Sequence, residues 1–108
     1  MREKDIFRVI ADPTRREIIS LLTQEAMPMN AIAERFPDIS RPAVSKHVKV
    51  LTDHGLIMIH KDGRERFCHA QLGPLKEISE WVNQYEQFWN EKLDHLGDFL
   101  KQKYSKKG

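Results

Sequence analysis

The sequence predicts a mainly α fold with a small β-hairpin, a winged helix-turn-helix with additional N- and C-terminal helices. Three patterns support this fold class. Apolar residues recur at helical spacing through the first half of the chain, and after residue 55 they change to two short strand-like runs. An Asp-Gly dipeptide, a common two-residue hairpin turn, lies between these runs. Helical spacing then returns from about residue 73 to about residue 103.

Two short helices are expected at the N-terminal side. Apolar residues at 6–10 predict a helix that ends near Ala11. Asp12 is a strong N-cap, and Pro13 is tolerated at the first helical position because its missing N–H has no partner there. The second helix therefore begins at this pair. Residues 24–28 are predicted to form a loop.

The helix-turn-helix is expected at about residues 29–54. A short helix over 31–36 ends before Pro37, because the residue that precedes a proline is pushed out of helical geometry. Ser40 is the predicted N-cap of a longer helix. Gly55 is well placed to end that helix.

The wing is expected at about residues 56–70. With Asp62 and Gly63 as the two turn residues, Ile59 faces Arg66 and Ile57 faces Cys68 on the other strand. Ile57 would then cover Cys68, so we interpret this thiol as structural rather than as a redox sensor.

The C-terminal helix, about 73–103, carries more apolar surface than its own domain can cover. Its apolar residues are spaced 3 or 4 apart, close to a heptad seam, and a helix of about 30 residues spans roughly 45 Å. We therefore expect a homodimer, with an effector pocket lined by the tryptophans as the alternative. Gly97 is a position where this helix could bend. The predicted interface residues are Ile6, Phe7, Val82, Tyr85, Trp89, Leu93 and Leu96.

Length and composition limit the remaining choices. The 108 residues fit a single domain, 1–108, and a chain this short gains stability from a partner subunit. No apolar stretch approaches the roughly 18 residues of a membrane helix, and the charged N-terminus is not a signal peptide. One cysteine excludes an internal disulfide framework. We expect no membrane insertion and a cytoplasmic location.

The helix from about 40 to 53 carries the predicted function. On a helical wheel Val44, Val48 and Leu51 share one face, while cations and small polar groups occupy the other. A recognition helix in the DNA major groove needs this arrangement, because Arg or Lys reaches guanine O6 and N7. The basic hairpin would contact phosphates or the minor groove. The predicted DNA-binding residues are Ser40, Arg41, Pro42, Ser45, Lys46, Lys49, Lys61, Arg64 and Arg66.

The same residues are compatible with other interpretations. The helix face could be merely solvated and the hairpin a solubilising turn, and the fold could instead serve as a protein-interaction module. An enzyme is not expected, because the chain has no Gly-rich phosphate loop and no catalytic set in a plausible arrangement. Arg15 and Arg16 are expected to be surface or capping residues rather than base readers.

The chain resembles the ArsR-type family of bacterial winged-helix repressors. The matching segments are ADPTRREI at 11–18, IAERF at 32–36, SRPAVSKHVKVL at 40–51, GLI at 55–57 and DGR at 62–64. This resemblance covers residues 4–72 well. It implies a homodimer joined through the terminal helices, bound to an imperfect palindrome in double-stranded DNA, with repression as the output.

The sequence departs from the metal-sensing members of that family. Their Cys-x-Cys pair is replaced here by Val44 to His47, and only the adjacent Asp94 and His95 are candidates on the last helix. The remaining histidines and Cys68 share no ligand-like spacing, and His60 and His69 are expected to meet only by accident across a dimer. We expect no metal and no cofactor, as in metal-independent autorepressors. A metal-responsive repressor with a non-standard site remains the alternative, and an unknown protein or small-molecule effector stays open.

Overall fold

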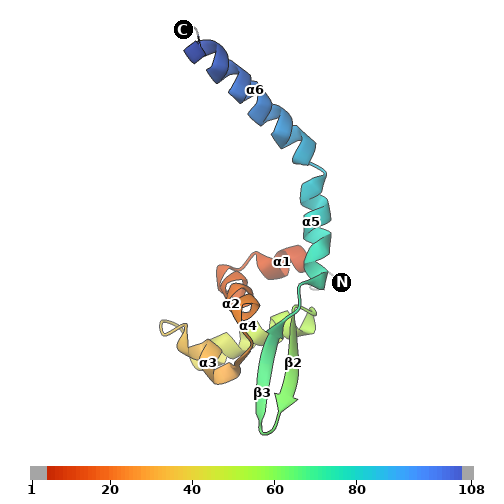
Figure 1. Cartoon of the computed structure of the whole chain (residues 1–108). Helices are drawn as coiled ribbons and strands as arrows, with labels where there is room; N and C mark the ends of the chain where they lie inside the picture. The colour runs from red at the N-terminus through yellow and green to blue at the C-terminus, as the bar shows by residue number, and fades with distance from the viewer. Residues whose placement is uncertain (1–4, 106–108) are drawn as a thin grey trace. The chain divides into compact units, whose positions relative to one another are not determined.

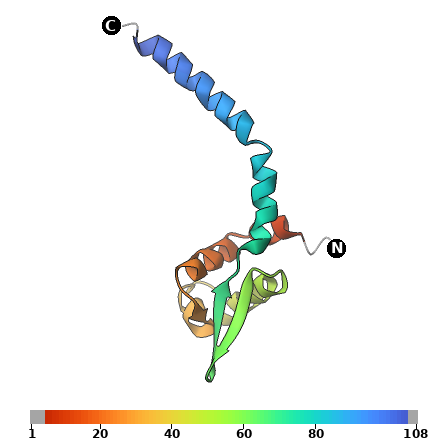
Figure 2. The same ribbon diagram turned by 45° about the vertical axis from the view of Figure 1, so that its right-hand side comes forward.

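The computed structural model describes residues 5–105, with side chains to residue 103, and divides into two units. The first extends to Glu77 and the second begins at Ile78, within one helix. Figures 1 and 2 show the helices and the hairpin of the first unit.

Four helices form most of the first unit. They are α1 (Ile6–Ile10), α2 (Pro13–Gln24), α3 (Met29–Glu34) and α4 (Arg41–Asp53). The predicted caps are confirmed: Asp12 Oδ1 accepts from Thr14 N at 2.8 Å and Arg15 N at 3.2 Å, and Ser40 Oγ accepts from Ala43 N at 3.2 Å. The helix α3 begins two residues earlier than expected and also ends two residues earlier. No side chain caps the N-terminus of α3, so its start had no capping signal to mark it.

The core is built from one face of each element. The apolar side chains predicted for the inner face of α4 are buried. On α2, Ile18, Ile19 and Leu22 are buried, whereas Leu21 is only partly buried. The residues with less than 2% exposure are Ile18, Ile32, Val44, Leu51 and Leu56. Gly55, at φ +76°, ends the α4 segment as predicted, since this left-handed conformation disfavours side chains with a Cβ. The chain then turns directly into the wing.

The sheet has a third strand that the sequence did not predict. The strands are β1 (Met27–Pro28), β2 (Ile57–Asp62) and β3 (Glu65–Ala70), antiparallel in the order β1-β3-β2. The prediction of a loop over 24–28 was therefore wrong. A two-residue strand leaves no periodicity to detect, and it exists because β3 offers it an edge.

The predicted register of the hairpin was also wrong. Ile57 is the Cα partner of Ala70, and Ile59 is the partner of Cys68, so Asp62 pairs with Glu65 instead of lying in the turn. The turn residues are Gly63 and Arg64. Gly63 has φ +69° and no described non-glycine residue has positive φ, as expected when glycine takes the first central position of a type II′ turn.

The predicted long C-terminal helix is interrupted. After a 3₁₀ turn at Gly73–Leu75 come α5 (Lys76–Asn83) and α6 (Glu86–Ser105). At the break, Gln84 N donates to Trp81 O at 3.2 Å and Tyr85 N donates to Val82 O at 2.9 Å. Each bond joins residues three positions apart, which is the 3₁₀ spacing, whereas an α-helix joins residues four positions apart. No glycine or proline marks this point, whereas Gly97 lies inside α6 without breaking it. A single uninterrupted helix was therefore the wrong expectation.

Candidate nucleic-acid interface

The helix α4 separates its two faces completely. Val44, Val48 and Leu51 are buried in the core of the first unit, as predicted. The opposite strip, called the α4 strip below, lies in solvent. Its residues Arg41, Pro42, Ser45, Lys46 and Lys49 are all exposed, and so is Ser40 at the N-cap. This face is open to a large partner.

Two cations of the α4 strip have protein partners. Arg41 Nη1 donates to Asn30 Oδ1 at 2.9 Å, a bond between the two helices of the helix-turn-helix. Lys49 Nζ lies 3.0 Å from Asp53 Oδ2, one turn further along α4. Both pairs are exposed, and the exposed ion pair of Lys49 with Asp53 adds little to stability. Their effect is to fix where these side chains point.

The end of α1 is tied to α2 by two arginines. Arg15 Nε donates to the carbonyl of Val9 at 2.7 Å, and Arg16 Nη1 donates to the carbonyl of Ile10 at 2.7 Å. These carbonyls lack helical partners, so the arginines cap α1. Of the expected surface or capping roles for Arg15 and Arg16, the structure shows capping contacts for both. Arg15 Nη1 also lies 3.3 Å from His47 Nδ1, which connects this cap to α4.

The Asp12 cap is also an electrostatic feature. Burial alone would raise the pKa of Asp12, but hydrogen bonds from the backbone of Arg15 and Thr14 outweigh it. The nearby His47 and Arg15 side chains act in the same direction. The pKa of Asp12 is therefore held below its ordinary value, and the ionised cap is favoured in the folded state.

The basic and the acidic residue pairs of the wing lie on opposite faces of the hairpin. Lys61 and Arg66 are Cα partners on the face that also carries Ile59 and Cys68, and α4 lies on that side. Asp62 and Glu65 pair on the opposite face. Like charges placed directly opposite repel, so the cation pair carries a cost in the free protein that a polyanion would remove. Arg64 is exposed at the turn.

A groove of about 320 Å³ joins α4 to the wing. Ser45, Lys49 and Asp53 line it from α4, while Ile59 and Arg66 line it from the hairpin. Both views show the hairpin extending beyond the helices of this unit (Figures 1 and 2). Predicted site residues from two separate segments thus share one surface.

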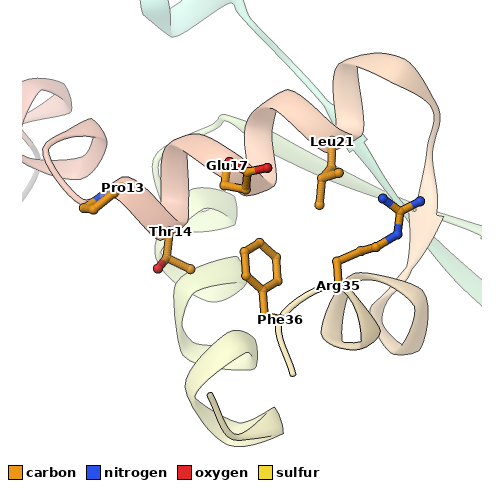
Figure 3. A pocket seen from close by; sticks show the side chains of 6 residues that line it. All are labelled: Pro13, Thr14, Glu17, Leu21, Arg35 and Phe36. Carbon is orange, nitrogen blue, oxygen red and sulfur yellow. The ribbon is translucent and has the colours of Figure 1, made fainter. Parts of the chain in front are cut away.

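A second pocket, of about 400 Å³, lies between α2 and the segment that follows α3. Figure 3 shows Phe36 pointing toward α2, where Glu17 and Leu21 lie. Its full lining is Pro13, Thr14, Glu17, Leu21, Arg35 and Phe36. The pocket is open and mixes one carboxylate and one guanidinium with apolar groups, and none of the predicted site residues lines it.

The residues predicted for a dimer interface fall into two groups. Ile6 is only 6% exposed and Phe7 is half-buried, so α1 offers little surface. Val82, Tyr85, Trp89, Leu93 and Leu96 are exposed, Leu93 by 62%. Trp81, Phe88 and Trp89, with Val82 and Tyr85, line a nearly apolar groove of about 350 Å³ within the second unit.

Cys68 is buried, which agrees with the interpretation of a structural thiol. Burial raises the pKa of this thiol, and the charge of Arg66 opposes the shift only in part. Ile59, rather than Ile57, is its cross-strand partner on β2. The protonated form is the unreactive one.

The histidines of the wing are placed differently from the expectation. His60 and His69 lie on the same outer face of the hairpin, with their ring centroids 5.9 Å apart. The expectation that they would meet only across a dimer was wrong, because it depended on the wrong register. Within residues 5–105, no three His, Cys, Asp or Glu side chains gather closely enough to hold a metal.

Sequence reasoning missed two partners of the α4 strip. The i, i+4 spacing of Lys49 and Asp53 is a known helix pairing and could have been found. Asn30 could not have been found, because its contact with Arg41 joins residues eleven positions apart across a turn.

None of the helices in the described part of the chain has the length and apolarity to cross a membrane.

The comparisons with known proteins agree with one another. A family described as a helix-turn-helix domain matches residues 10–60. The transcriptional repressor SdpR of Bacillus subtilis (strain 168) is 33% identical over 78 residues, which covers 72% of this chain and 86% of that protein. The solved ArsR family transcriptional regulator RHA00566 superposes with TM-score 0.67 at 33% identity, over 79% of this chain and 87% of that one.

A more distant structure is similar at the level of the fold. It is the homodimeric winged helix-turn-helix DNA-binding domain Mb0332 from Mycobacterium bovis. It is 19% identical, with TM-score 0.56, over 83% of this chain and 80% of that one. The predicted winged helix-turn-helix is therefore confirmed.

Proposed function

This chain belongs to the ArsR family of winged helix-turn-helix proteins and is a DNA-binding transcriptional regulator, and from this premise we propose that it is a homodimeric repressor that reads its operator with the α4 strip. The family consists of transcriptional regulators and not of enzymes. A chromosomal target would place the working protein in the cytoplasm.

The observation that carries the proposal is the exposure of the α4 strip beside a fully buried inner face. Arg41 and Lys46 lie within the first two turns of α4, the part of a recognition helix that contacts base edges. Either cation can bind guanine O6 and N7, while Ser45 can accept or donate to several bases. The buried face anchors the helix, so the strip enters the groove as a rigid unit.

The wing contributes phosphate contacts. Lys61 and Arg66 repel one another across the strands, and Arg64 extends the same charge to the turn. Binding phosphate would relieve this repulsion without reading sequence. We infer that these three cations add affinity and salt dependence without sequence preference, while specificity comes from the α4 strip.

The exposed apolar surface of the second unit supports the proposed homodimer. An exposed apolar stripe on a helix of 20 residues needs a cover in water, and a second copy presents the same stripe. The similar domain from Mycobacterium bovis is homodimeric. Two α4 strips related by a twofold axis would read half-sites about one turn, or roughly 34 Å, apart on an imperfect palindrome.

The test is selection of bound sequences from a random pool of double-stranded DNA by the full chain. We expect an enriched inverted repeat, with affinity that falls steeply as salt rises. Lys46→Ala should weaken binding to the selected site, whereas Lys101→Ala, on α6, is the matched control. Sedimentation of the chain and of Leu93→Glu should report a dimer and a weakened dimer.

Two results would overturn the proposal. A pool without an enriched motif would mean that the α4 strip does not read bases. The alternative of a protein-interaction module with the same fold would then replace the repressor. A monomer bound to a single half-site would leave the DNA contacts in place and remove the dimer.

A further inference from the structure

The outer face of the hairpin gathers soft and nitrogen ligands. Strand alternation places Met58 and His60 of β2 on the same face, and His69 of β3 lies on that face directly opposite Met58. Met58 is 54% exposed, His60 is exposed and His69 is half-exposed. All three side chains can therefore reach a solute.

The spacing suits a single ion. Directly opposite residues on antiparallel strands have Cβ atoms about 4.5–5.5 Å apart, which brings the Met58 thioether and the His69 ring together. His60 is the diagonal neighbour of His69, and their ring centroids lie 5.9 Å apart in an edge-to-face arrangement. Small rotations of flexible side chains would turn three donor atoms toward one point.

We propose that Met58, His60 and His69 form a binding site for Cu(I) on the outer face of the wing. Thioether sulfur is a soft ligand that selects Cu(I), and imidazole also suits copper. Hard cations such as Mg²⁺ and Ca²⁺ require oxygen ligands, which this set does not provide. This site is compatible with the absence of a cluster of three His, Cys, Asp or Glu side chains among residues 5–105, because its third donor is a methionine.

The surroundings favour a cation on this face. Asp62 and Glu65 pair at the tip on the same face as His60, so the local potential attracts positive charge. The wing cations Lys61 and Arg66 lie on the other face. Phe67, the half-buried partner of His60, adds an apolar wall beside the ligands. The proposal stands on the hairpin alone and does not depend on DNA binding.

The experiment is an anaerobic titration of the full metal-free chain with Cu(I), in competition with the chromogenic chelator bicinchoninate. We expect one Cu(I) per chain. Met58→Leu, His60→Gln and His69→Gln should each lower Cu(I) affinity by about tenfold or more. The loss of a residue that only hydrogen-bonds to a metal ligand already lowers metal affinity by about that factor. His95→Gln, an exposed histidine on α6, is the matched control and should leave affinity unchanged.

X-ray absorption at the copper edge supplies a second readout, with one sulfur and two nitrogen donors expected. Circular dichroism of each variant verifies that the fold is retained. Unchanged affinity in Met58→Leu, or in both histidine variants, would overturn the site. The same conclusion would follow if the chain failed to compete with the chelator, or if His95→Gln abolished binding.

Discussion

The Arg41 guanidinium donates a 2.9 Å hydrogen bond from Nη1 to Oδ1 of Asn30, so the first helix of the helix-turn-helix holds a side chain of the second. Arginine loses rotamer entropy when it is ordered at a base edge, and a partner that orders it beforehand reduces that loss. Asn30 is therefore expected to act on DNA through Arg41.

The first prediction concerns this pair. Arg41→Ala should cost about 1–3 kcal/mol against the preferred operator and relax preference at one base pair. Asn30→Ala should relax the same base pair by a smaller amount, because the guanidinium remains but is no longer held. Binding to a set of operators with single base changes measures both effects.

Asn30→Gln is the control, since its amide oxygen can still accept from Arg41 and the substitution adds no charge. The double variant Asn30→Ala with Arg41→Ala should be no worse than Arg41→Ala alone. Strictly additive losses would show that Asn30 acts independently of Arg41.

The second prediction concerns Asp53, whose carboxylate lies 3.0 Å from Lys49 Nζ. This acid competes with DNA phosphate for the lysine. Asp53→Asn should strengthen DNA binding and steepen the dependence on salt by about one released counterion. Asp98→Asn, on α6, changes the net charge equally and should have a smaller effect. Equal effects of the two variants would mean that net charge alone is responsible.

The third prediction separates the wing from α4. Arg64→Ala should weaken binding to all DNA sequences alike and flatten the salt dependence, because a phosphate contact carries no sequence information. Lys46→Ala should cost about 1–3 kcal/mol on the operator and much less on unrelated DNA. Titrations of both variants on operator and random duplexes distinguish the roles. A sequence-selective loss in Arg64→Ala would assign the turn to base reading.

The fourth prediction concerns Cys68, which is buried and has a raised pKa. At neutral pH the thiol should stay protonated, and alkylating reagents should modify it only as fast as the protein opens. Mass spectrometry of iodoacetamide-treated protein, with and without denaturant, measures the difference. Rapid modification of the native protein would contradict the structural role of the thiol.

The fifth prediction concerns Asp12, whose pKa is lowered in the folded state. Its ionisation therefore contributes stability that is present above the unfolded pKa of about 3.9 and is lost as pH falls through the folded pKa. Asp12→Asn should retain a capping oxygen but flatten this acid-side loss. Asp12→Ala should lower the free energy of unfolding at neutral pH by about 0.5–2 kcal/mol. Denaturant unfolding at several pH values measures both effects.

Local signals along the chain were sufficient for the starts of α2 and α4 and for the two faces of α4. Asp12 and Ser40 cap because each carboxylate or hydroxyl reaches amides only two or three residues away. Val44, Val48 and Leu51 are buried because their spacing brings them to one side of a helix. These features depend on neighbours within one turn, so the order of residues alone predicts them.

Local signals did not predict the hairpin register. The predicted and observed registers differ by two residues in pairing, and both keep Ile57, Ile59 and Cys68 on the same face. Alternation of apolar residues cannot choose between them, because a slip of two leaves every side chain on its side of the sheet. The turn at Gly63 and Arg64 makes the choice, and it brings His60 beside His69.

The sequence by itself determined the starts and caps of α2 and α4, the buried face of α4 and the basic strip opposite it. Only the tertiary structure decided the pairing of Met27 with Cys68, the hydrogen bond from Arg41 to Asn30 and the histidine pair on the wing. The physical reason is range. Periodicity and capping are set by residues one turn apart, whereas cross-strand and interhelical contacts exist only after distant segments have packed.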